Sequence, residues 1–253
     1  MSSGFWQRVR NPWVATGVCL TALVCVGLGL FVFQVIRSYR SIKSGQPDSL
    51  ETARRKALVE RVLSQPALSG IEKTLLASKV QDPVLGNPKG RIHIVEFLDY
   101  QCPFCAESAP ALRAFMAKHA QEVSLTLRDY PIEELHPLAV QAAIAARCVF
   151  RQGNDAVFWR YHDLLFSNQE HASSIDLHDF AVRAGADGSA FDRCVAIKMP
   201  EADIRASLRD GSALQIQGTP TFFVNNHRLP GAIDLTTLEE LYSQLTASSS
   251  SPL

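Results

Sequence analysis

The chain has 253 residues, 47% of them hydrophobic and 20% charged, and its 25 basic side chains balance its 25 acidic ones. This length provides for one large domain or two small ones, each with a buried core. The sequence shows no basic patch with interleaved aromatic residues, which argues against nucleic acid as a partner.

The first predicted element is an apolar run, Trp13–Ile36, which follows a short N-terminal tail of residues 1–12. Its 24 residues contain no charge. As a helix they would reach about 36 Å, more than the roughly 30 Å hydrocarbon core of a bilayer. The alternative is a cleaved signal peptide, whose apolar core is usually about 7–15 residues and is followed by a small-residue cleavage site. The sequence therefore favours an uncleaved transmembrane anchor, although its flanking positive charges are too evenly distributed to orient it.

Residues 37–81 are predicted to form a polar linker and a helical stalk. Apolar residues at helical spacing predict a helix that starts near Leu50 and ends at Pro66. Residues 69–80 have the composition of a second short helix. The segment 50–80 is interpreted either as a solvated spacer or as an interface through which copies of the chain associate.

A domain over residues 82–246 is predicted to begin with a turn-rich segment, 82–90, that leads into a strand. That strand, Arg91–Asp99, is largely apolar on both faces, and Glu96 lies within it. A strand of this kind is typical of the centre of a sheet that is covered on both sides. Alternating apolar residues predict a second strand within 123–130.

From residue 136 to residue 217 the pattern is helical throughout. Two strands, 221–224 and 227–229, would then pair across an Asn-Asn turn. A last helix is expected to begin at a capping Asp234, before a serine-rich tail of residues 247–253 that is predicted to be disordered. This order of elements predicts an α/β sheet domain interrupted by a helical insertion.

The stretch VEFLDYQCPFC, residues 95–105, contains two cysteines at C-x-x-C spacing. Cys102 follows the buried strand and is expected at the start of a helix, where free amides and the helix dipole favour a thiolate. Cys105 lies one turn further, close enough to attack a disulfide formed at Cys102. Burial should raise the pKa of Glu96, which is a candidate to take a proton from Cys105.

Other interpretations of these residues remain open. A C-x-x-C pair can be half of a zinc site, although no matching second pair of ligands occurs in the sequence. The pair can also form a purely structural bridge, but so short a loop gives little entropic stabilisation. Glu96 can be a hydrogen-bonded buried polar group with no role in proton transfer.

Residues 82–246 resemble a DsbA-like thiol–disulfide oxidoreductase of the thioredoxin superfamily. VEFLDYQCPFC resembles the strand and active-site motif of that family, with Glu96 where the superfamily often has a buried acid. Pro110 falls where thioredoxin-like helices carry a kinking proline, and GTPTFFV resembles the loop whose proline is cis. The helical block 136–217 resembles the DsbA-type insertion. The resemblance implies a thioredoxin-like α/β fold with a helical insertion, preceded here by a transmembrane helix.

The resemblance also implies a role for each residue of the site. Cys102 would be the nucleophile and Cys105 the resolving cysteine, with Glu96 as the third catalytic residue. A cis bond would precede the loop proline, which costs only about 0.5–1 kcal/mol at an X–Pro bond. The implied substrate-binding residues are Pro103, Phe104, Thr219 and Pro220.

The dipeptide between the two cysteines departs from the family pattern. Strongly oxidising members often carry Pro-His there, whereas this chain has Pro103 and Phe104. Phe104 supplies no positive charge to stabilise a thiolate at Cys102. We therefore expect a weaker oxidant than the relatives that have histidine at this position.

Two further cysteines, Cys148 and Cys194, lie on predicted helices of the insertion. In an oxidising compartment they would form a structural disulfide, and some DsbA-like relatives have a second bridge in this region. The alternative is two buried free thiols that act as small apolar side chains. The histidines are scattered along the chain, and no metal-binding set is apparent.

The predicted function is an extracytoplasmic protein thiol–disulfide oxidoreductase, with oxidase activity favoured over isomerase or reductase activity. The expected partners are substrate proteins and a membrane redox protein, and no cofactor is expected. The expected location is the bacterial inner membrane, with a single span and the catalytic domain facing the periplasm or the cell exterior. The alternatives are a protein that handles a soft metal such as copper through Cys102 and Cys105, or a redox-inert chaperone or scaffold.

Overall fold

The structure is a computed structural model, and the residues it describes are 12–43, 49–77, 79, 81–171 and 173–248. The chain divides into two compact units, residues 1–56 and 57–253. Most of the two predicted terminal tails, and part of the predicted linker, lie outside the described residues.

The first unit contains one long helix, α2 (Pro12–Lys43). Its segment Thr21–Tyr39 is apolar, is not buried, and is long enough to cross a bilayer. The helix continues past Ile36, where the predicted span ended. It does so because Arg37–Lys43 contains no helix-breaking residue, whereas Gly45 and Pro47 follow shortly in the sequence.

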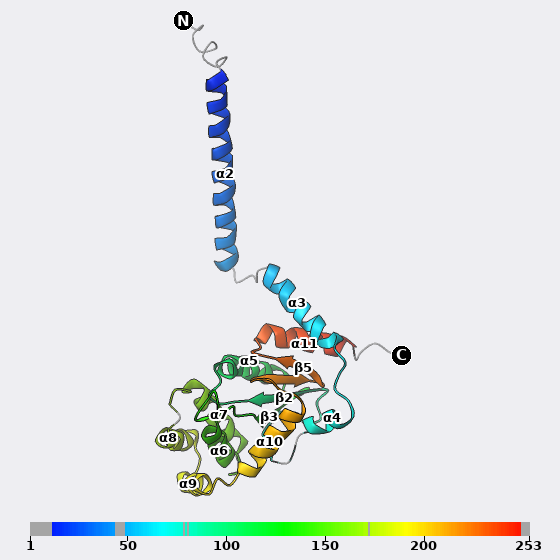
Figure 1. The fold of residues 1–253 in the computed structure, drawn as a ribbon, viewed down its shortest axis with the longest axis vertical. Coiled ribbons are helices and arrows are strands. Elements are labelled where there is room, and N and C mark those ends of the chain that lie inside the picture. Colours follow the sequence, from blue (N-terminus) through cyan, green and yellow to red (C-terminus); the bar gives the residue numbers. More distant parts are fainter. Residues whose placement is uncertain (1–11, 44–48, 78, 80, 172, 249–253) are drawn as a thin grey trace. The chain divides into compact units, whose positions relative to one another are not determined.

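The second unit contains a five-stranded sheet in the order β1-β3-β2-β4-β5 (Figure 1). The predicted strands are confirmed as β2 (Ile92–Leu98) and β3 (Val123–Asp129), which pair in parallel at the centre. The other two predicted strands are β4 (Thr221–Val224) and β5 (His227–Pro230), which form an antiparallel hairpin beside β2.

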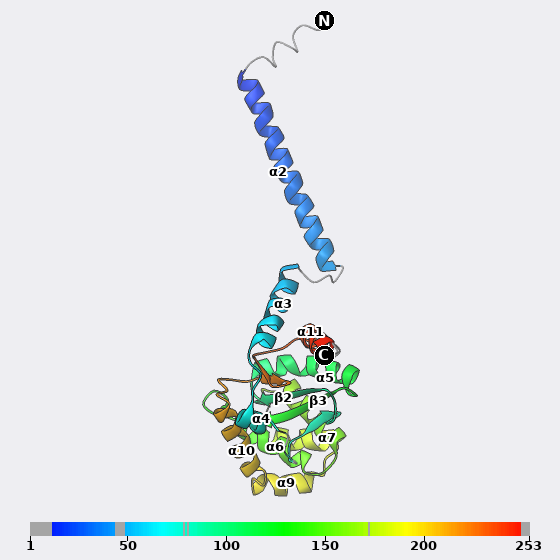
Figure 2. The same ribbon diagram turned by 90° about the vertical axis from the view of Figure 1, so that its right-hand side faces the viewer.

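Helices cover both faces of the sheet, as the two-sided apolar pattern of β2 predicted. Helices α5 (Pro103–His119) and α11 (Leu235–Ser248) pack together on one side (Figure 2). On the other side, Phe97 of β2 packs in a separate apolar cluster with Leu214 and Ile216, which follow α10 (Glu201–Ala213). Burial of β2 on both faces therefore positions its C-terminal end, from which the C-x-x-C motif continues.

The edge strand β1 (Val84–Gly86) was not predicted, because residues 82–90 were interpreted as a turn-rich lead. This strand has only three residues, and it is specified by backbone pairing with β3 rather than by an apolar pattern. Gly86 has φ +86°, and a Cβ there would lie 2.3 Å from the carbonyl oxygen of Val123. Only glycine therefore fits at this close approach.

The predicted stalk contains two helices, of which the first closely matches its sequence pattern. Helix α3 (Ser49–Ser64) starts in the first unit, and its residues Val59 and Val62 are buried in the core of the second. Helix α4 (Gly70–Leu76) covers less than the predicted 69–80.

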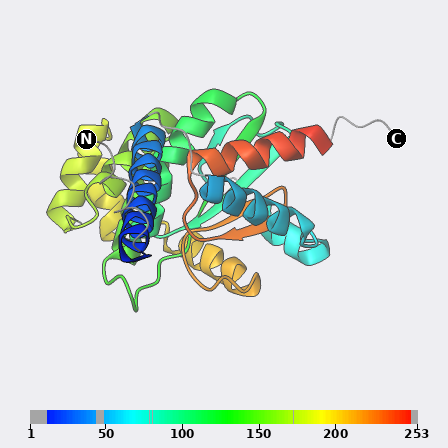
Figure 3. The same cartoon turned by 90° about the horizontal axis from the view of Figure 1, so that it is seen from above.

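The helical insertion consists of several short helices, of which those in residues 174–196 lie at the left of Figure 3, and the last, residues 201–213, lies apart from them. They are α6 (Ala139–Phe150), α7 (Asp155–Ser167), α8 (Ser174–Ala184), α9 (Gly188–Ala196) and α10. Side-chain caps and a left-handed Gly185 set the ends of several of them.

Buried ion pairs attach the insertion to the sheet. Arg147 of α6 pairs with Asp129 at the end of β3 and with Asp82, at 2.5 and 3.3 Å. Arg128 of β3 pairs with Asp82 at 3.6 Å and with Asp210 of α10. Removing one member of such a network leaves a buried charge unpaired, at a cost of about 3–5 kcal/mol. The sequence pattern did not predict this network.

Cys148 of α6 and Cys194 of α9 form a disulfide across the insertion, with their Cα atoms 5.7 Å apart. Both residues are buried. The bridge closes a loop across a sequence separation of 46, so it constrains the unfolded chain strongly.

We predict that replacing Cys148 and Cys194 by serine lowers the free energy of unfolding by about 4 kcal/mol, because the loop constraint on the unfolded chain is lost. Denaturant unfolding of the full chain would measure the change. The bridge itself is tested by counting free thiols in a second variant, in which Cys102, Cys105 and the two cysteines of α2 are replaced and Cys148 and Cys194 are kept. In that variant, two titratable thiols under denaturing, non-reducing conditions would contradict the bridge.

Candidate active site

The two cysteines of CPFC lie where the central strand β2 passes into helix α5. Cys102 is the N-cap residue of α5, and Pro103 occupies the first turn. Proline suits this position because the amide groups of the first turn have no partner within the helix. The amide of Cys102 donates to the carbonyl oxygen of Asp99 at 3.1 Å. The predicted position at a helix start is therefore confirmed.

The two thiols differ in their surroundings, although both are free. Cys102 is 4% exposed, and Cys105, one turn into the helix, is 0% exposed. Phe104 between them is 57% exposed, so the motif carries an apolar side chain on the surface beside Cys102.

A second segment reaches the same place from far along the chain. The bond between Thr219 and Pro220 is cis. The thiol of Cys102 donates to the carbonyl oxygen of Thr219 at 3.1 Å, across a sequence separation of 117. The hydroxyl of Thr219 is buried and has no hydrogen-bond partner among the described residues. It is therefore available to donate to a thiolate at Cys102.

The surroundings of Cys102 stabilise its thiolate. Its pKa is lowered to about 5, chiefly by a hydrogen bond from the Cys105 thiol. Further donors act in the same direction, namely the Thr219 side chain and the backbone amides of Cys105 and Phe104, whereas burial opposes them. Donors aimed at the charged form of a group lower the pKa of an acid. Cys102 is therefore ionised at neutral pH.

Cys105 has the opposite electrostatic environment. Burial raises the pKa of its thiol, and the hydrogen bond to Cys102 and the charge of Glu96 act in the same direction. Loss of water removes the stabilisation of a thiolate, and a nearby carboxylate repels it. Cys105 therefore remains a thiol until a base takes its proton.

Glu96 lies within β2 and is 2% exposed. Burial raises the pKa of its carboxyl group to about 8. This carboxyl group acts electrostatically on Cys105. Glu96 is thus a buried acid that changes its protonation state near neutral pH, as a group that exchanges protons with Cys105 must.

Asp99 was not predicted as part of the site, yet it shapes the turn before Cys102. Its carboxylate accepts hydrogen bonds from the amides of Gln101 and Ile132 and from Nδ1 of His136, at 2.8, 2.9 and 2.7 Å. The loop that precedes α6 is thereby attached to the active-site turn. An acidic residue that closes a buried strand was the available sequence signal, but Ile132 and His136 are more than 30 residues away.

Gln169 was also not predicted as part of the site. Its amide nitrogen donates to the carbonyl oxygens of Tyr100 and Cys102, both at 2.9 Å. This side chain, just after α7, links the helical insertion to the cysteine turn. Nothing in the local sequence distinguishes Gln169 from other polar residues at a helix end.

The structure brings most of the predicted site residues together around α5 and the cis-proline loop. Cys148 and Cys194 are separate, in the insertion. Within the described part of the chain, no group of three or more His, Cys, Asp or Glu side chains is placed to hold a metal ion.

A family model described as thioredoxin matches residues 78–244 of this chain. A thioredoxin-like oxidoreductase from Silicibacter pomeroyi DSS-3 is 27% identical, with a TM-score of 0.61 over 71% of this chain and 99% of that one. The thiol-disulfide exchange protein alpha-DsbA2 from Wolbachia pipientis is 22% identical, with a TM-score of 0.63 over 76% and 98% of the two chains. The solved structures therefore share the thioredoxin-like fold, and the predicted fold class is confirmed.

Sequence relatives include the Na(+)/H(+) antiporter NhaA 1 of Mycolicibacterium gilvum (strain PYR-GCK). It is 32% identical over 178 residues, which are 70% of this chain and 28% of the relative. The chain thus spans little more than a quarter of the length of this relative.

We predict that Thr219→Val raises the pKa of Cys102 by about one pH unit. The substitution keeps the shape of the side chain but removes a donor to the thiolate, and a hydrogen bond to a charged group contributes about 1.5–3 kcal/mol. The ultraviolet absorbance of the thiolate, followed against pH in the reduced chain, measures the shift.

Thr221→Val is the matched control, because the Thr221 hydroxyl donates to the carbonyl oxygen of Gly218 at 2.7 Å and not to the thiol. It removes a buried hydroxyl two residues further along the chain, at the start of β4. Equal pKa shifts in both variants would show that the Thr219 hydroxyl does not act on the thiolate directly.

Proposed function

The chain belongs to the thioredoxin family, and we propose that it is a DsbA-like protein thiol–disulfide oxidoreductase that works through Cys102 and Cys105. The observation that carries the proposal is the difference in pKa between the two thiols. The surroundings lower the pKa of Cys102 to about 5 and raise that of Cys105. One thiolate is thus ready to attack or leave, while its neighbour stays protonated.

The reaction proceeds through a mixed disulfide. In the oxidising direction, a substrate thiolate attacks the Cys102 sulfur of the Cys102–Cys105 disulfide and displaces Cys105 as a thiolate. Glu96, still protonated at neutral pH because its pKa is about 8, gives Cys105 a proton. A second substrate thiolate then attacks the substrate sulfur bonded to Cys102, which leaves as a stabilised thiolate. The substrate loses two electrons, and the cysteine pair of the protein gains them.

The direction of transfer follows from the stability of the reduced form. A stabilised Cys102 thiolate makes the dithiol state more favourable and the disulfide easier to reduce. This supports oxidase activity over reductase activity. Phe104 adds no positive charge, so the oxidising power is lower than with histidine at that position.

The substrate site lies beside Cys102. The cis bond between Thr219 and Pro220 holds the Thr219 carbonyl against the Cys102 thiol. Pro103 and Phe104, which follow Cys102 in the chain, present an exposed apolar surface. An extended substrate segment can bind there through its backbone, as an added strand does.

The proposed location is the bacterial inner membrane, with α2 as a single span and the catalytic domain in the periplasm. The apolar length of α2 supports a membrane span. The Cys148–Cys194 disulfide supports an oxidising compartment for the domain. A membrane redox partner would then reoxidise the Cys102–Cys105 pair.

Association between copies of the chain is a further part of the proposal. Leu58 of α3 and Ile71 of α4 are 40% and 81% exposed. Apolar side chains exposed within the segment 50–80 are suited to contact with another copy.

The site fits the alternatives less well. A soft metal ion bound by the pair requires two thiolates, whereas the pKa of Cys105 is raised by burial. A redox-inert scaffold gives no reason for a thiolate-stabilising environment at Cys102.

The function is tested by trapping. We predict that Cys105→Ser accumulates mixed disulfides between Cys102 and substrate proteins in cells, because the resolving thiol is missing. Cys102→Ser should form none. In vitro, the oxidised full chain should introduce disulfides into a reduced, unfolded substrate protein, and Cys102→Ser should not. Equal trapping by the two variants in cells, or disulfide formation by Cys102→Ser in vitro, would contradict the proposal.

We predict that Glu96→Gln slows the attack of Cys105 on a mixed disulfide by roughly 100-fold, the usual range for loss of a general base. In the parent chain this step should accelerate as the pH rises through about 8, where Glu96 becomes a carboxylate. The variant should lose that inflection. Stopped-flow measurement of mixed-disulfide decay against pH provides the test, with Glu107→Gln on the exposed face of α5 as the control.

Stability gives an independent check of the same group. A glutamate side chain ordinarily titrates at 4.5, and burial raises the pKa of Glu96 to about 8, so between these values the folded chain holds a proton that the unfolded chain has released. The contribution of Glu96 to stability is therefore full below pH 4.5 and is lost as the pH rises towards 8. Glu96→Gln should remove this part of the pH dependence. An unchanged stability profile would contradict the buried state of Glu96.

A further inference from the structure

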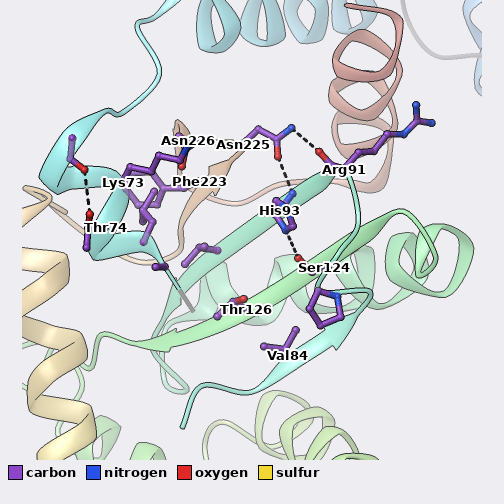
Figure 4. A pocket seen from close by; sticks show the side chains of 15 residues that line it. Lys73, Thr74, Val84, Arg91, His93, Ser124, Thr126, Phe223, Asn225 and Asn226 are labelled. Carbon is purple, nitrogen blue, oxygen red and sulfur yellow. Dashed lines mark hydrogen bonds between the residues drawn. The ribbon is translucent and has the colours of Figure 1, made fainter. Parts of the chain in front are cut away.

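A cavity of about 750 Å³ lies on the sheet, on the same face as the cluster around Phe223 (Figure 4). Its floor is formed by the N-terminal halves of β2 and β3, and α4 borders it. Cys102 follows the C-terminal end of β2, so the cavity and the cysteines lie at opposite ends of this strand. The redox mechanism uses none of the residues that line the cavity.

The lining of this cavity is basic. It includes Lys73, Arg91 and His93, and the described residues that line it include no Asp or Glu. Arg91 is bound to Glu122 at the rim, where its Nε donates to a carboxylate oxygen at 2.7 Å. Lys73 forms no ion pair within the part of the chain that the structure describes. An uncompensated ammonium group beside a concave surface attracts anions.

Unpartnered polar groups on the floor also face the cavity. Nδ1 of His93 is hydrogen-bonded to the Ser124 hydroxyl at 2.8 Å, and Nε2 has no partner among the described residues. Thr126 is 5% exposed, yet its hydroxyl makes no hydrogen bond to any residue in the described ranges. Figure 4 shows this side chain on β3, directed into the cavity beside Ser124. A hydroxyl that faces a cavity and has no protein partner can bind a ligand or a water molecule.

We propose that this cavity binds a small organic anion, with a carboxylate or phosphate group attached to an apolar body. The anionic group binds to the ammonium group of Lys73 and accepts hydrogen bonds from Nε2 of His93 and the hydroxyl of Thr126. Val95 and Phe223, which also line the cavity, contact the apolar body. The volume lies within the roughly 300–1,000 Å³ typical of small-molecule sites. The site is separate from the cysteine pair and does not depend on the redox proposal.

The test uses phenyl phosphate as the probe and phenol as its uncharged counterpart. The full chain is held in phosphatidylcholine nanodiscs, and binding is followed by titration calorimetry with empty nanodiscs subtracted. We expect saturable binding of one phenyl phosphate per chain and binding of phenol at least about tenfold weaker, since a charge-assisted hydrogen bond contributes about 1.5–3 kcal/mol. Absence of saturable binding, or equal binding of phenol, would overturn the proposal.

Two variants locate the binding. Lys73→Met and Thr126→Val keep the size of each side chain and should each weaken phenyl phosphate binding about tenfold. Lys198→Met, at an exposed residue in the insertion, makes the same charge change and should have no effect. The far-ultraviolet circular dichroism spectrum should be unchanged in all three variants, which shows that they fold. Equal affinities for Lys73→Met and Lys198→Met would place the anion elsewhere and refute the site.

Discussion

The rest of the site depends on one constraint, which is that helix α5 begins directly after the buried central strand β2. Because β2 is covered on both faces, its C-terminal end is held in place, and Cys102 caps the helix that follows. Cys105 is then carried one turn inward, where water is excluded. Two chemically identical thiols thus acquire opposite tendencies to ionise from a difference of three residues along one helix.

Distant parts of the chain form hydrogen bonds with the turn at which α5 begins, and not only with the cysteine side chains. The cis-proline loop places the Thr219 carbonyl on the Cys102 sulfur, Asp99 ties the preceding turn to the loop before α6, and Gln169 holds the Cys102 carbonyl from the insertion. The buried ion pairs of Arg147 attach the insertion to the end of β3. His136 and Gln169 both bind the turn that contains Cys102, and both belong to the helical insertion. The insertion therefore helps to position this turn.

Sequence patterns predicted the elements whose signal is local. The two-sided apolar run of β2, the Asn225-Asn226 hairpin, whose two residues have positive φ, and the capping Asp234 all appear as expected. Strand β1 was missed because backbone pairing and the close approach at Gly86 specify it. Asp99 and Gln169 were missed because their partners are distant in sequence. The residues proposed to do the chemistry could therefore be named from the sequence, whereas those that position them required the fold.

The central claim is that Cys102 and Cys105 differ in ionisation because of where α5 begins. It is tested most directly by brief treatment of the reduced full chain with limiting iodoacetamide at about pH 6, well below the ordinary thiol pKa of about 8.5. Mass spectrometry then identifies the alkylated residue. The account predicts modification at Cys102 and almost none at Cys105. Modification of Cys105 at an equal or faster rate would contradict it.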